Sequence, residues 1–484
     1  MEELLKRYIE KFNREDTEYY SQDIPNQKAE EWLSENIPLI DIPDKDLEKI
    51  YYFRWWTFRK HIKTTPDGVI LTEFLPKVCW SGTHNSIIAA VGHHLAEAKW
   101  LKCSKKLIEE YTKFWLEEKG DTYLYSTWML YALYEYSIHT NDFSFGVENL
   151  SLLMNYYDKV EAKHMTECGL MWSIDDNDAM EYSISGSTEA EVGSKGLRPT
   201  LNSYMAANAF AISEFAKKAG QEEIAQKYWE KYVSLKEKMN EILWDKDFYK
   251  AIHIADFKNP TMEQVAPEQN VRELIGYIPW CFHLAPKGYE TAFSQLKQKD
   301  GFLSPYGLMT AEKRHPRYLY EVGHVCLWNG YICPFATSQV LDDMVALLKD
   351  YEQDTVTKED FYRVLSQYAG MHTFEKDGKT VCWIDEVRNP ENNEWCCRKL
   401  LQDMGWPESA GGMERGKDYN HSTFCNIILG GLLGISVENG EIQVNPKIPD
   451  NWEQFQVENL WVNGAAYRIT YNKSSESPVV VERM

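Results

Sequence analysis

Apolar residues recur at helical spacing through most of the chain. Between Leu201 and Ile242 they recur three or four positions apart in two runs, and Gly220 stands between the runs. Two helices joined by so short a turn pack against each other in antiparallel fashion. Similar patterns predict further helices at residues 86–101, 123–139, 149–163, 338–351, 358–368 and 422–433. About a dozen helices in consecutive antiparallel pairs are expected, and such pairs can close into a ring with a funnel at one end.

The pattern changes after residue 435 to short runs in which apolar and polar residues alternate. Asn439-Gly440 and Asn463-Gly464 lie between these runs and are typical of two-residue hairpin turns. A sheet of this size is marginally stable alone, so we expect it to pack against the helices, together with an extended segment near residues 38–42. The chain therefore divides into an N-terminal helical or extended segment (1–50), a helical body (51–435) and a small β-sheet (436–484).

Composition narrows the classes of function. The 74 acidic and 52 basic residues leave a net charge of −22, which repels nucleic acid and anionic lipid. No stretch is apolar for long enough to span a bilayer, and the N-terminus lacks the apolar run of a secretory signal. The protein is therefore expected in the cytoplasm, or in the periplasm or outside the cell if a leader has been removed. The 10 cysteines show neither zinc-ligand spacing nor a disulfide framework, so no metal is expected.

The most acidic segment lies in a predicted loop. Asp175, Asp176, Asp178 and Glu181 fall within seven positions, close to Trp172. Like charges at this spacing raise one another's pKa, which keeps one carboxyl group protonated near neutral pH. A calcium loop and a solvated acidic turn are the alternatives, although the spacing lacks the glycine and the distal glutamate of an EF-hand loop.

Two later segments add candidates for the same chemistry. Asp385 and Glu386 follow Trp383, and a second loop rich in glycine and charge precedes an apolar helix. The charged residues of that second loop are Glu414, Arg415, Asp418 and His421. An inverting glycosidase needs a protonated carboxyl group and a carboxylate about 6.5–9.5 Å apart, with aromatic rings around the sugar. Two acidic loops about two hundred residues apart in the sequence could supply such a pair.

Eight motifs resemble those of one group of enzymes, in the same order. They are YYFRWWTFRKHI (51–62), WSGTHNSI (80–87), IDDNDAMEYSISG (174–186), RPTLNSYM (198–205), LWDKDFY (243–249), CLWNGYICPFATSQ (326–339), WIDEVRNP (383–390) and ERGKDYNHSTF (414–424). With these motifs the chain resembles the glycoside hydrolase clan of processing α-glucosidases and mannosylglycerate hydrolase. Within that clan it is most similar to a bacterial branch with a mannosylglycerate-hydrolase-like catalytic domain.

The resemblance implies an all-α fold, an (α/α)6 six-hairpin toroid with a small C-terminal β-sheet segment. It also implies exo-acting, inverting cleavage of an oligosaccharide or glycan side chain without metal or organic cofactor. The base motif of the family, E-N-x-x-P, matches Glu386, with Val387 in place of Asn. The acid maps onto Asp175 or Asp178, and Asp175 is preferred. Cys333 replaces an aromatic residue in a loop that faces the substrate in relatives, so the accepted sugar is expected to differ.

The resemblance and the loops together give the expected sugar-binding residues. They are Arg54, Trp55, Trp56, Arg59, His84, Asn85, Trp172, Glu181, Arg198, Asn202, Trp328, Trp383, Glu414, Arg415, Asp418 and His421. The alternative for each is packing, since adjacent tryptophans also suit a buried helix and a buried arginine can pair with an acid. The expected partner is a carbohydrate, with neither nucleic acid nor membrane, and the sequence leaves the sugar, the linkage and the oligomeric state open.

Two other functions fit the same sequence features. A sugar epimerase or isomerase on an α-toroid would move protons with paired histidines, and the candidates are His84, His93, His94, His324 and His421. His93 and His94 are adjacent and cannot lie on one helix face, which weakens that reading. A carbohydrate-binding protein without catalysis would keep the aromatic cleft but lack a working carboxyl pair, which the two acidic loops argue against.

Overall fold

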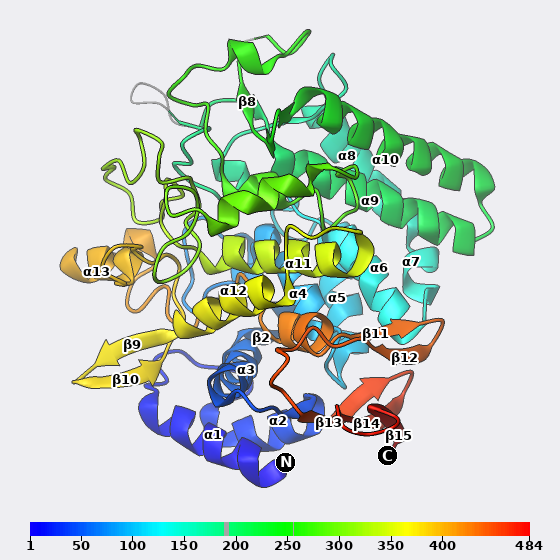
Figure 1. Ribbon diagram of the computed structural model, residues 1–484, viewed down its shortest axis with the longest axis vertical. Coiled ribbons are helices and arrows are strands. Elements are labelled where there is room, and N and C mark those ends of the chain that lie inside the picture. Colours follow the sequence, from blue (N-terminus) through cyan, green and yellow to red (C-terminus); the bar gives the residue numbers. More distant parts are fainter. Residues whose placement is uncertain (188–192, 255) are drawn as a thin grey trace.

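The computed structural model describes residues 1–187, 193–254 and 256–484, and its architecture is rich in helices, with small separate sheets (Figure 1). The N-terminal part contains α1 (Glu2–Glu15), α2 (Ala29–Asn36) and α3 (Lys45–Phe58). The remaining helices are α4 (Val91–Ala98), α5 (Ser104–Leu116), α6 (Met129–Thr140), α7 (Ser144–Glu148), α8 (Leu150–His164), α9 (Pro199–Lys218), α10 (Glu222–Ile242), α11 (Pro334–Asp350), α12 (Lys358–Gly370) and α13 (Cys396–Asp403). None of the described helices is long and apolar enough to cross a membrane.

The hairpin of α9 and α10 shows how an inner and an outer helix differ. Pro199 starts α9, where a missing backbone N–H costs nothing, and Gly220 follows its end with φ +69°. Most of the 20 residues of α9 are buried, whereas α10 buries a single stripe that includes Tyr228, Leu235 and Met239. The hairpin predicted from the sequence is therefore present, with α9 enclosed and α10 facing solvent on one side (Figure 1).

Three inner helices share the same direction. The residues just before α4, α6 and α11, including Ile87, Tyr125 and Cys333, line one cavity. A second cavity is lined by residues at the C-terminal ends of the same helices. They include Lys99, directly after α4, His139 in α6 and Asp350 in α11. These helices therefore run in the same direction, from one cavity to the other, and the loops at their N-terminal ends build the first cavity.

The helix expected at residues 422–433 is shorter and has a different geometry. It takes the π form over Ile427–Leu432. The buried carboxylate of Glu97 accepts hydrogen bonds from the backbone N–H groups of Phe424, Cys425 (3.0 Å) and Asn426 (2.9 Å). A side chain from α4 therefore satisfies the free N–H groups at the start of this helix and fixes where it begins.

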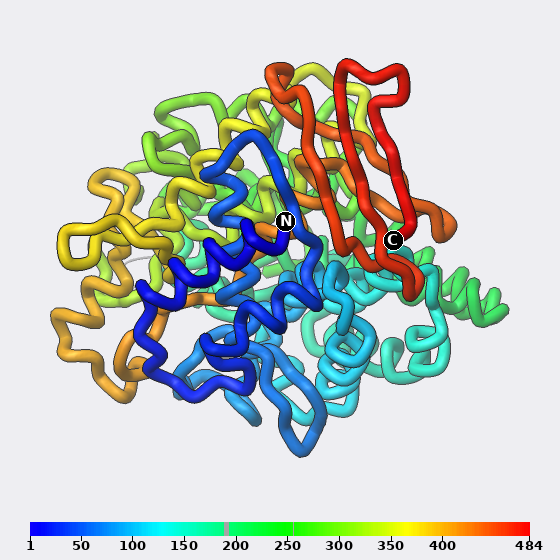
Figure 2. Tube along the Cα trace, turned by 90° about the horizontal axis from the view of Figure 1, so that it is seen from below, coloured from blue at the N-terminus to red at the C-terminus, as the bar shows by residue number. Residues whose placement is uncertain are grey.

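The C-terminal sheet joins both ends of the chain. Its strands are, in order, β1 (Leu39–Asp41), β13 (Gln454–Val462), β14 (Ala465–Asn472) and β15 (Val479–Arg483), all antiparallel. Figure 2 shows the N-terminal segment beside these strands. A separate hairpin pairs β11 (Ile435–Glu438) with β12 (Glu441–Val444). At both predicted Asn-Gly turns the two residues have positive φ, from 50° to 82°, as such hairpin turns require.

Candidate active site

The loops at the N-terminal ends of the inner helices enclose a cavity of about 630 Å³. Its lining includes four acidic residues, Glu73, Asp176, Glu181 and Glu386, and two basic ones, Arg415 and His324. Five aromatic rings also line it: Phe74, Trp80, Tyr125, Trp328 and Tyr419. Carboxyl groups among aromatic faces are the composition of a site that binds and acts on a polyhydroxylated ring.

Glu386 is buried in this cavity and forms an ion pair with the buried guanidinium group of Arg415. Its backbone N–H donates to Oδ1 of Asp385 at 3.0 Å, which fixes the turn that carries it. Arg415 contacts Oε1 of Glu386, and within the described chain no hydrogen bond reaches Oε2. Glu386 therefore presents a charge-balanced carboxylate with one oxygen free for a water molecule.

Arg415 is itself held in place by its surroundings. Its guanidinium carbon lies 5.1 Å from the ring centroid of Trp80, and its Nη1 donates to the carbonyl oxygen of Ala410 at 3.3 Å. Gly411 has φ +97°, and a Cβ there would lie 2.7 Å from Cδ of Arg415. A side chain at position 411 would therefore displace the arginine that balances Glu386.

Glu181 has the opposite environment. Burial raises its pKa to about 8, and the negative charges of Asp176, Glu386 and Glu73 raise it as well. Among the described residues no side chain donates a hydrogen bond or an ion pair to its carboxyl group. Glu181 therefore keeps its proton at neutral pH, while Glu386 in the same cavity is paired with a cation.

A strained turn aims Glu181 at the cavity. Ala179 (φ 57°) and Tyr182 (φ 58°) both take left-handed backbone conformations, which cost energy for residues other than glycine. Met180 is fully buried, and its Sδ lies 3.8 Å from Nη2 of Arg198. Consecutive side chains thus point to opposite sides, with Met180 in the core and Glu181 in the cavity lining.

Asp178, one of the two acids expected from the sequence, lies in a closed polar network. Its Oδ2 pairs with Nε of Arg198 at 2.7 Å, and its Oδ1 accepts hydrogen bonds from Ser126 (2.8 Å) and Ser173 (3.1 Å). Both members of the ion pair have fully buried side chains. The pair anchors the acidic loop to the start of α9, and Asp178 is outside the cavity lining.

Asp175, the other expected acid, is also fully buried behind the cavity wall. Its Oδ2 accepts a hydrogen bond from Ser187 at 3.1 Å, and burial raises its pKa to about 6. A Cβ at Gly186 would lie 2.5 Å from its carboxyl carbon, so the chain packs tightly over it. Its neighbours Ile174 and Asp176 line the cavity, whereas Asp175 is not among the lining residues.

A third buried carboxyl group, Glu73, was not singled out from the sequence. Its Oε1 lies 3.0 Å from Nδ1 of His421, which is also 3.0 Å from the hydroxyl of Tyr419. His421 is buried and stands behind Glu73 rather than in the cavity lining. No local motif surrounds Glu73 in the sequence, so only the fold brings it to Glu181 and Glu386.

Most other residues expected to bind sugar are part of the packing around the site. Asn85 accepts a hydrogen bond from Val78 N–H (3.1 Å) and donates to the carbonyl of Phe74 (3.0 Å), so it shapes the loop that carries Phe74 and Trp80. Arg54 donates to the carbonyl of Ser422 at 2.7 Å. Within the described chain, those lying outside the cavity lining are Arg54, Trp55, Trp56, Arg59, His84, Asn85, Trp172, Arg198, Asn202, Trp383, Glu414, Asp418 and His421. Those in the lining are Glu181, Trp328 and Arg415.

The N-terminal segment is tied to the site by a buried charge network. Nζ of Lys60 lies 2.9 Å from Asp16 and 2.7 Å from Asp418, with all three side chains almost fully buried. Asp418 N–H donates to the carbonyl of Ile384 at 3.1 Å, just before the segment that carries Glu386. Asp418 therefore supports the segment that carries Glu386 through a backbone hydrogen bond, and its side chain does not line the cavity.

The histidines do not form a pair in the cavity. Of the five considered from the sequence, only His324 lines it. His93 and His94 are fully buried, and burial lowers the pKa of both, that of His94 to about 4. His84 lies 2.8 Å from Asp67 near the surface. The described part of the chain also contains no group of three or more His, Cys, Asp or Glu residues arranged to hold a metal ion.

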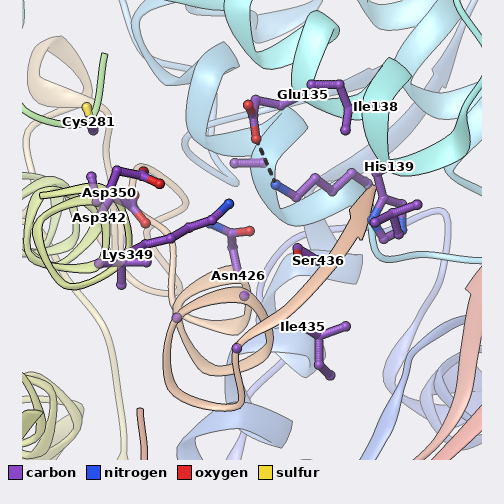
Figure 3. A pocket seen from close by; sticks show the side chains of 18 of the residues that line it. Glu135, Ile138, His139, Cys281, Asp342, Lys349, Asp350, Asn426, Ile435 and Ser436 are labelled. Carbon is purple, nitrogen blue, oxygen red and sulfur yellow. Dashed lines mark ion pairs between the residues drawn. The ribbon is translucent and has the colours of Figure 1, made fainter. Parts of the chain in front are cut away.

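A second cavity, of about 640 Å³, lies at the C-terminal ends of the same helices (Figure 3). Glu135 extends from α6 and is 3.9 Å from Nζ of Lys99, while Asp342 and Asp350 come from α11. Lys349 and Lys447 line the same cavity as these acidic groups. Burial also raises the pKa of Asp342, to about 7, so what distinguishes the first cavity is that the acidic loop and the segment with Glu386 line it and do not line the second.

Comparison with known proteins agrees with these observations. One solved structure, described as a sialidase, is 32% identical with a TM-score of 0.87, over 100% of this chain and 43% of that chain. A GH78 family rhamnosidase of Bacillus sp. GL1 is 12% identical with a TM-score of 0.56, over 93% of this chain and 41% of its own, a likeness of fold alone. The chain thus spans less than half of either relative, and no curated protein matches it. The model of the mannosylglycerate hydrolase MGH1-like glycoside hydrolase domain matches residues 83–422, most of the chain, so this protein belongs to that family of glycoside hydrolase domains.

Proposed function

We propose that the protein cleaves a glycosidic bond at the end of an oligosaccharide or glycan side chain, with inversion, using Glu181 as the general acid and Glu386 as the general base. The observation that carries the proposal is the contrast between two carboxyl groups of one cavity. The pKa of Glu181 is raised to about 8, while Glu386 is paired with Arg415. In a two-carboxylate glycosidase, the acid has a raised pKa and stays protonated, whereas the base stays ionised.

The proposed reaction is a single displacement. Glu181 gives its proton to the glycosidic oxygen as the bond to the anomeric carbon breaks. Glu386 accepts a proton, through Oε2, from a water molecule that attacks the same carbon from the opposite face. Arg415 stays on Oε1 and holds the carboxylate in position. Proton exchange with solvent then restores both groups.

Glu181 takes the role that the sequence motifs favoured for Asp175 or Asp178. A general acid must come within hydrogen-bond reach of the bond that it protonates. Asp178 is engaged by Arg198 and two serines, and Asp175 lies behind the wall. Asp176 is the remaining acidic residue of this loop in the lining, but its side chain is more exposed to solvent than that of Glu181.

The charge of the cavity favours a neutral sugar. Its described lining has four carboxyl groups, Glu73, Asp176, Glu181 and Glu386, and one arginine, which is already paired. An anionic sugar such as sialic acid would meet no unpaired arginine or lysine in this described lining and would be repelled by the carboxylates. We also propose that residues 51–435 form a six-hairpin toroid with this cavity at its axis, which is supported by the parallel inner helices and favours exo action.

Hydrolysis assays test the proposal. The wild type, Glu386→Gln and Glu181→Gln are compared on neutral aryl glycosides and oligosaccharides, with reducing sugar as the readout. Loss of turnover in Glu386→Gln, and partial rescue of Glu181→Gln by good leaving groups, is the expected pattern. An isomerised sugar instead of a hydrolysed one would favour the epimerase alternative, and binding without turnover would favour the inactive carbohydrate-binding protein.

A further inference from the structure

The mouth of the active-site cavity combines polar residues, among them Asp176 and Ser409, with a group of large apolar side chains. Three of its lining side chains are large, apolar and well exposed: Leu124 (40%), Leu400 (38%) and Met404 (57%). We call these three residues the apolar rim. Apolar side chains of this size exposed together in a cavity mark a surface that binds apolar ligand groups.

The exposed residues of α13 continue an apolar stripe that is packed at its other edge. Leu400 and Met404 are four positions apart at the end of α13, so they lie on one face of it. Cys397 and Leu401, each three positions from one of them, lie on the adjacent part of the same apolar stripe and are fully buried. Lys399 and Asp403, on the same helix, form an exposed ion pair with each other. Polar residues are thus used at the solvent-facing positions of α13, and apolar residues at the positions that line the cavity.

The chemistry of the cavity changes from its interior to its mouth. The interior contains the carboxyl groups of Glu73, Glu181 and Glu386, which match the hydroxyl groups of a sugar. The apolar rim offers no charged group and no side-chain hydrogen bond. A second sugar unit at the rim would lose hydrogen bonds to water without replacing them, whereas an apolar ring would release water from both surfaces.

We propose that the apolar rim binds the leaving group of the substrate, and that this group is an apolar, ring-containing alcohol or phenol rather than a second sugar. This inference rests on the proposed hydrolytic mechanism and replaces the oligosaccharide of that proposal with a glycoside whose leaving group is apolar. The sugar would occupy the acidic interior, and the aglycone would lie against Leu124, Leu400 and Met404. The natural substrate class is then a glycoside of a small apolar molecule.

The first experiment measures binding of the aglycone alone, with 2-naphthol as the probe. Its fluorescence is titrated with the wild type, with a Leu400→Ser/Met404→Ser variant, and with Met413→Ser as a matched control. Met413 is 49% exposed, similar to the rim residues, but it is outside the cavity lining. We expect saturable binding to the wild type and the control, weakened about tenfold in the double variant through lost apolar contact. Equal affinity in all three proteins, or no saturable binding to any, would overturn the proposal.

The second experiment separates this inference from the proposed function. The ratio of kcat/KM for the 2-naphthyl glycoside to that for the methyl glycoside of the same sugar is measured in the three proteins. The ratio should fall about tenfold in the double variant and stay constant in Met413→Ser. An unchanged ratio in the double variant refutes the role of the rim. If no glycoside is hydrolysed while 2-naphthol binding still depends on Leu400 and Met404, the reaction is refuted and the apolar site stands.

Discussion

Removing the acid group of Glu181 should sharply reduce hydrolysis of substrates with poor leaving groups and at the same time stabilise the protein in alkaline solution. The pKa of Glu181 is raised from 4.5 to about 8 by burial among other carboxyl groups. Because this carboxyl group binds its proton more tightly in the folded state than in the unfolded state, the folded protein loses stability as pH rises between these two values. The loss is complete above the folded-state pKa. The neutral amide of Gln carries no such penalty.

The structure sets an upper limit to this effect. A shift of 3.5 pKa units, from 4.5 to about 8, corresponds to at most about 5 kcal/mol at 1.36 kcal/mol per unit. Partial access to solvent through the cavity reduces this limit. Relative to the wild type, Glu181→Gln should therefore gain stability between pH 5 and pH 9, by roughly 2–4 kcal/mol after this reduction.

Urea unfolding of the wild type and Glu181→Gln at pH 5, 7 and 9 measures the difference in free energy of unfolding directly. Asp175, Asp342 and Asp385 also have raised pKa values, of about 6, 7 and 7, but they are common to both proteins and cancel in the difference. Glu391→Gln, at an exposed glutamate, provides the control and should show no dependence on pH. A difference for Glu181→Gln that stays constant from pH 5 to 9 would refute the environment assigned to Glu181.

The remaining predictions concern activity and the supports of the site. For the wild type, kcat/KM should fall as pH rises through about 8, where Glu181 loses its proton, and a pH–rate profile measures this. Arg198→Met should lower the free energy of unfolding, measured with urea, by about 3–5 kcal/mol, because Asp178 would remain buried without its partner. Gly416→Ala should lose activity while Gly220→Asn keeps it, since a Cβ at Gly416 would lie 1.8 Å from Oδ1 of Asp385 and one at Gly220 meets nothing within 4 Å. Circular dichroism of both glycine variants checks that they remain folded.

Local features of the fold could be predicted from the sequence because they depend on neighbours along the chain. The Asn-Gly hairpins are set by backbone preference alone, and the hairpin of α9 and α10 follows from apolar spacing around Gly220. The π geometry of Ile427–Leu432 could not be predicted, because Glu97, far away in the sequence, fixes the start of that helix.

The candidate site could be predicted only in part for the same reason. The acidic loop and the loop with Glu386 were both recognised, but the direction of each side chain in the first loop depends on tertiary structure. Left-handed conformations at Ala179 and Tyr182, and the anchoring of Asp178 by Arg198, decide that Glu181 enters the cavity. Glu73 has no sequence signal at all, since it comes to the cavity from the N-terminal part of the chain.

The most direct test of the central claim is proton NMR of the first sugar released from an aryl glycoside, compared between the wild type and Glu386→Gln. The account predicts release by the wild type of the anomer opposite to that of the substrate, and no release by Glu386→Gln. Release of the same anomer as the substrate, or undiminished release by Glu386→Gln, would contradict single displacement with Glu386 as the base.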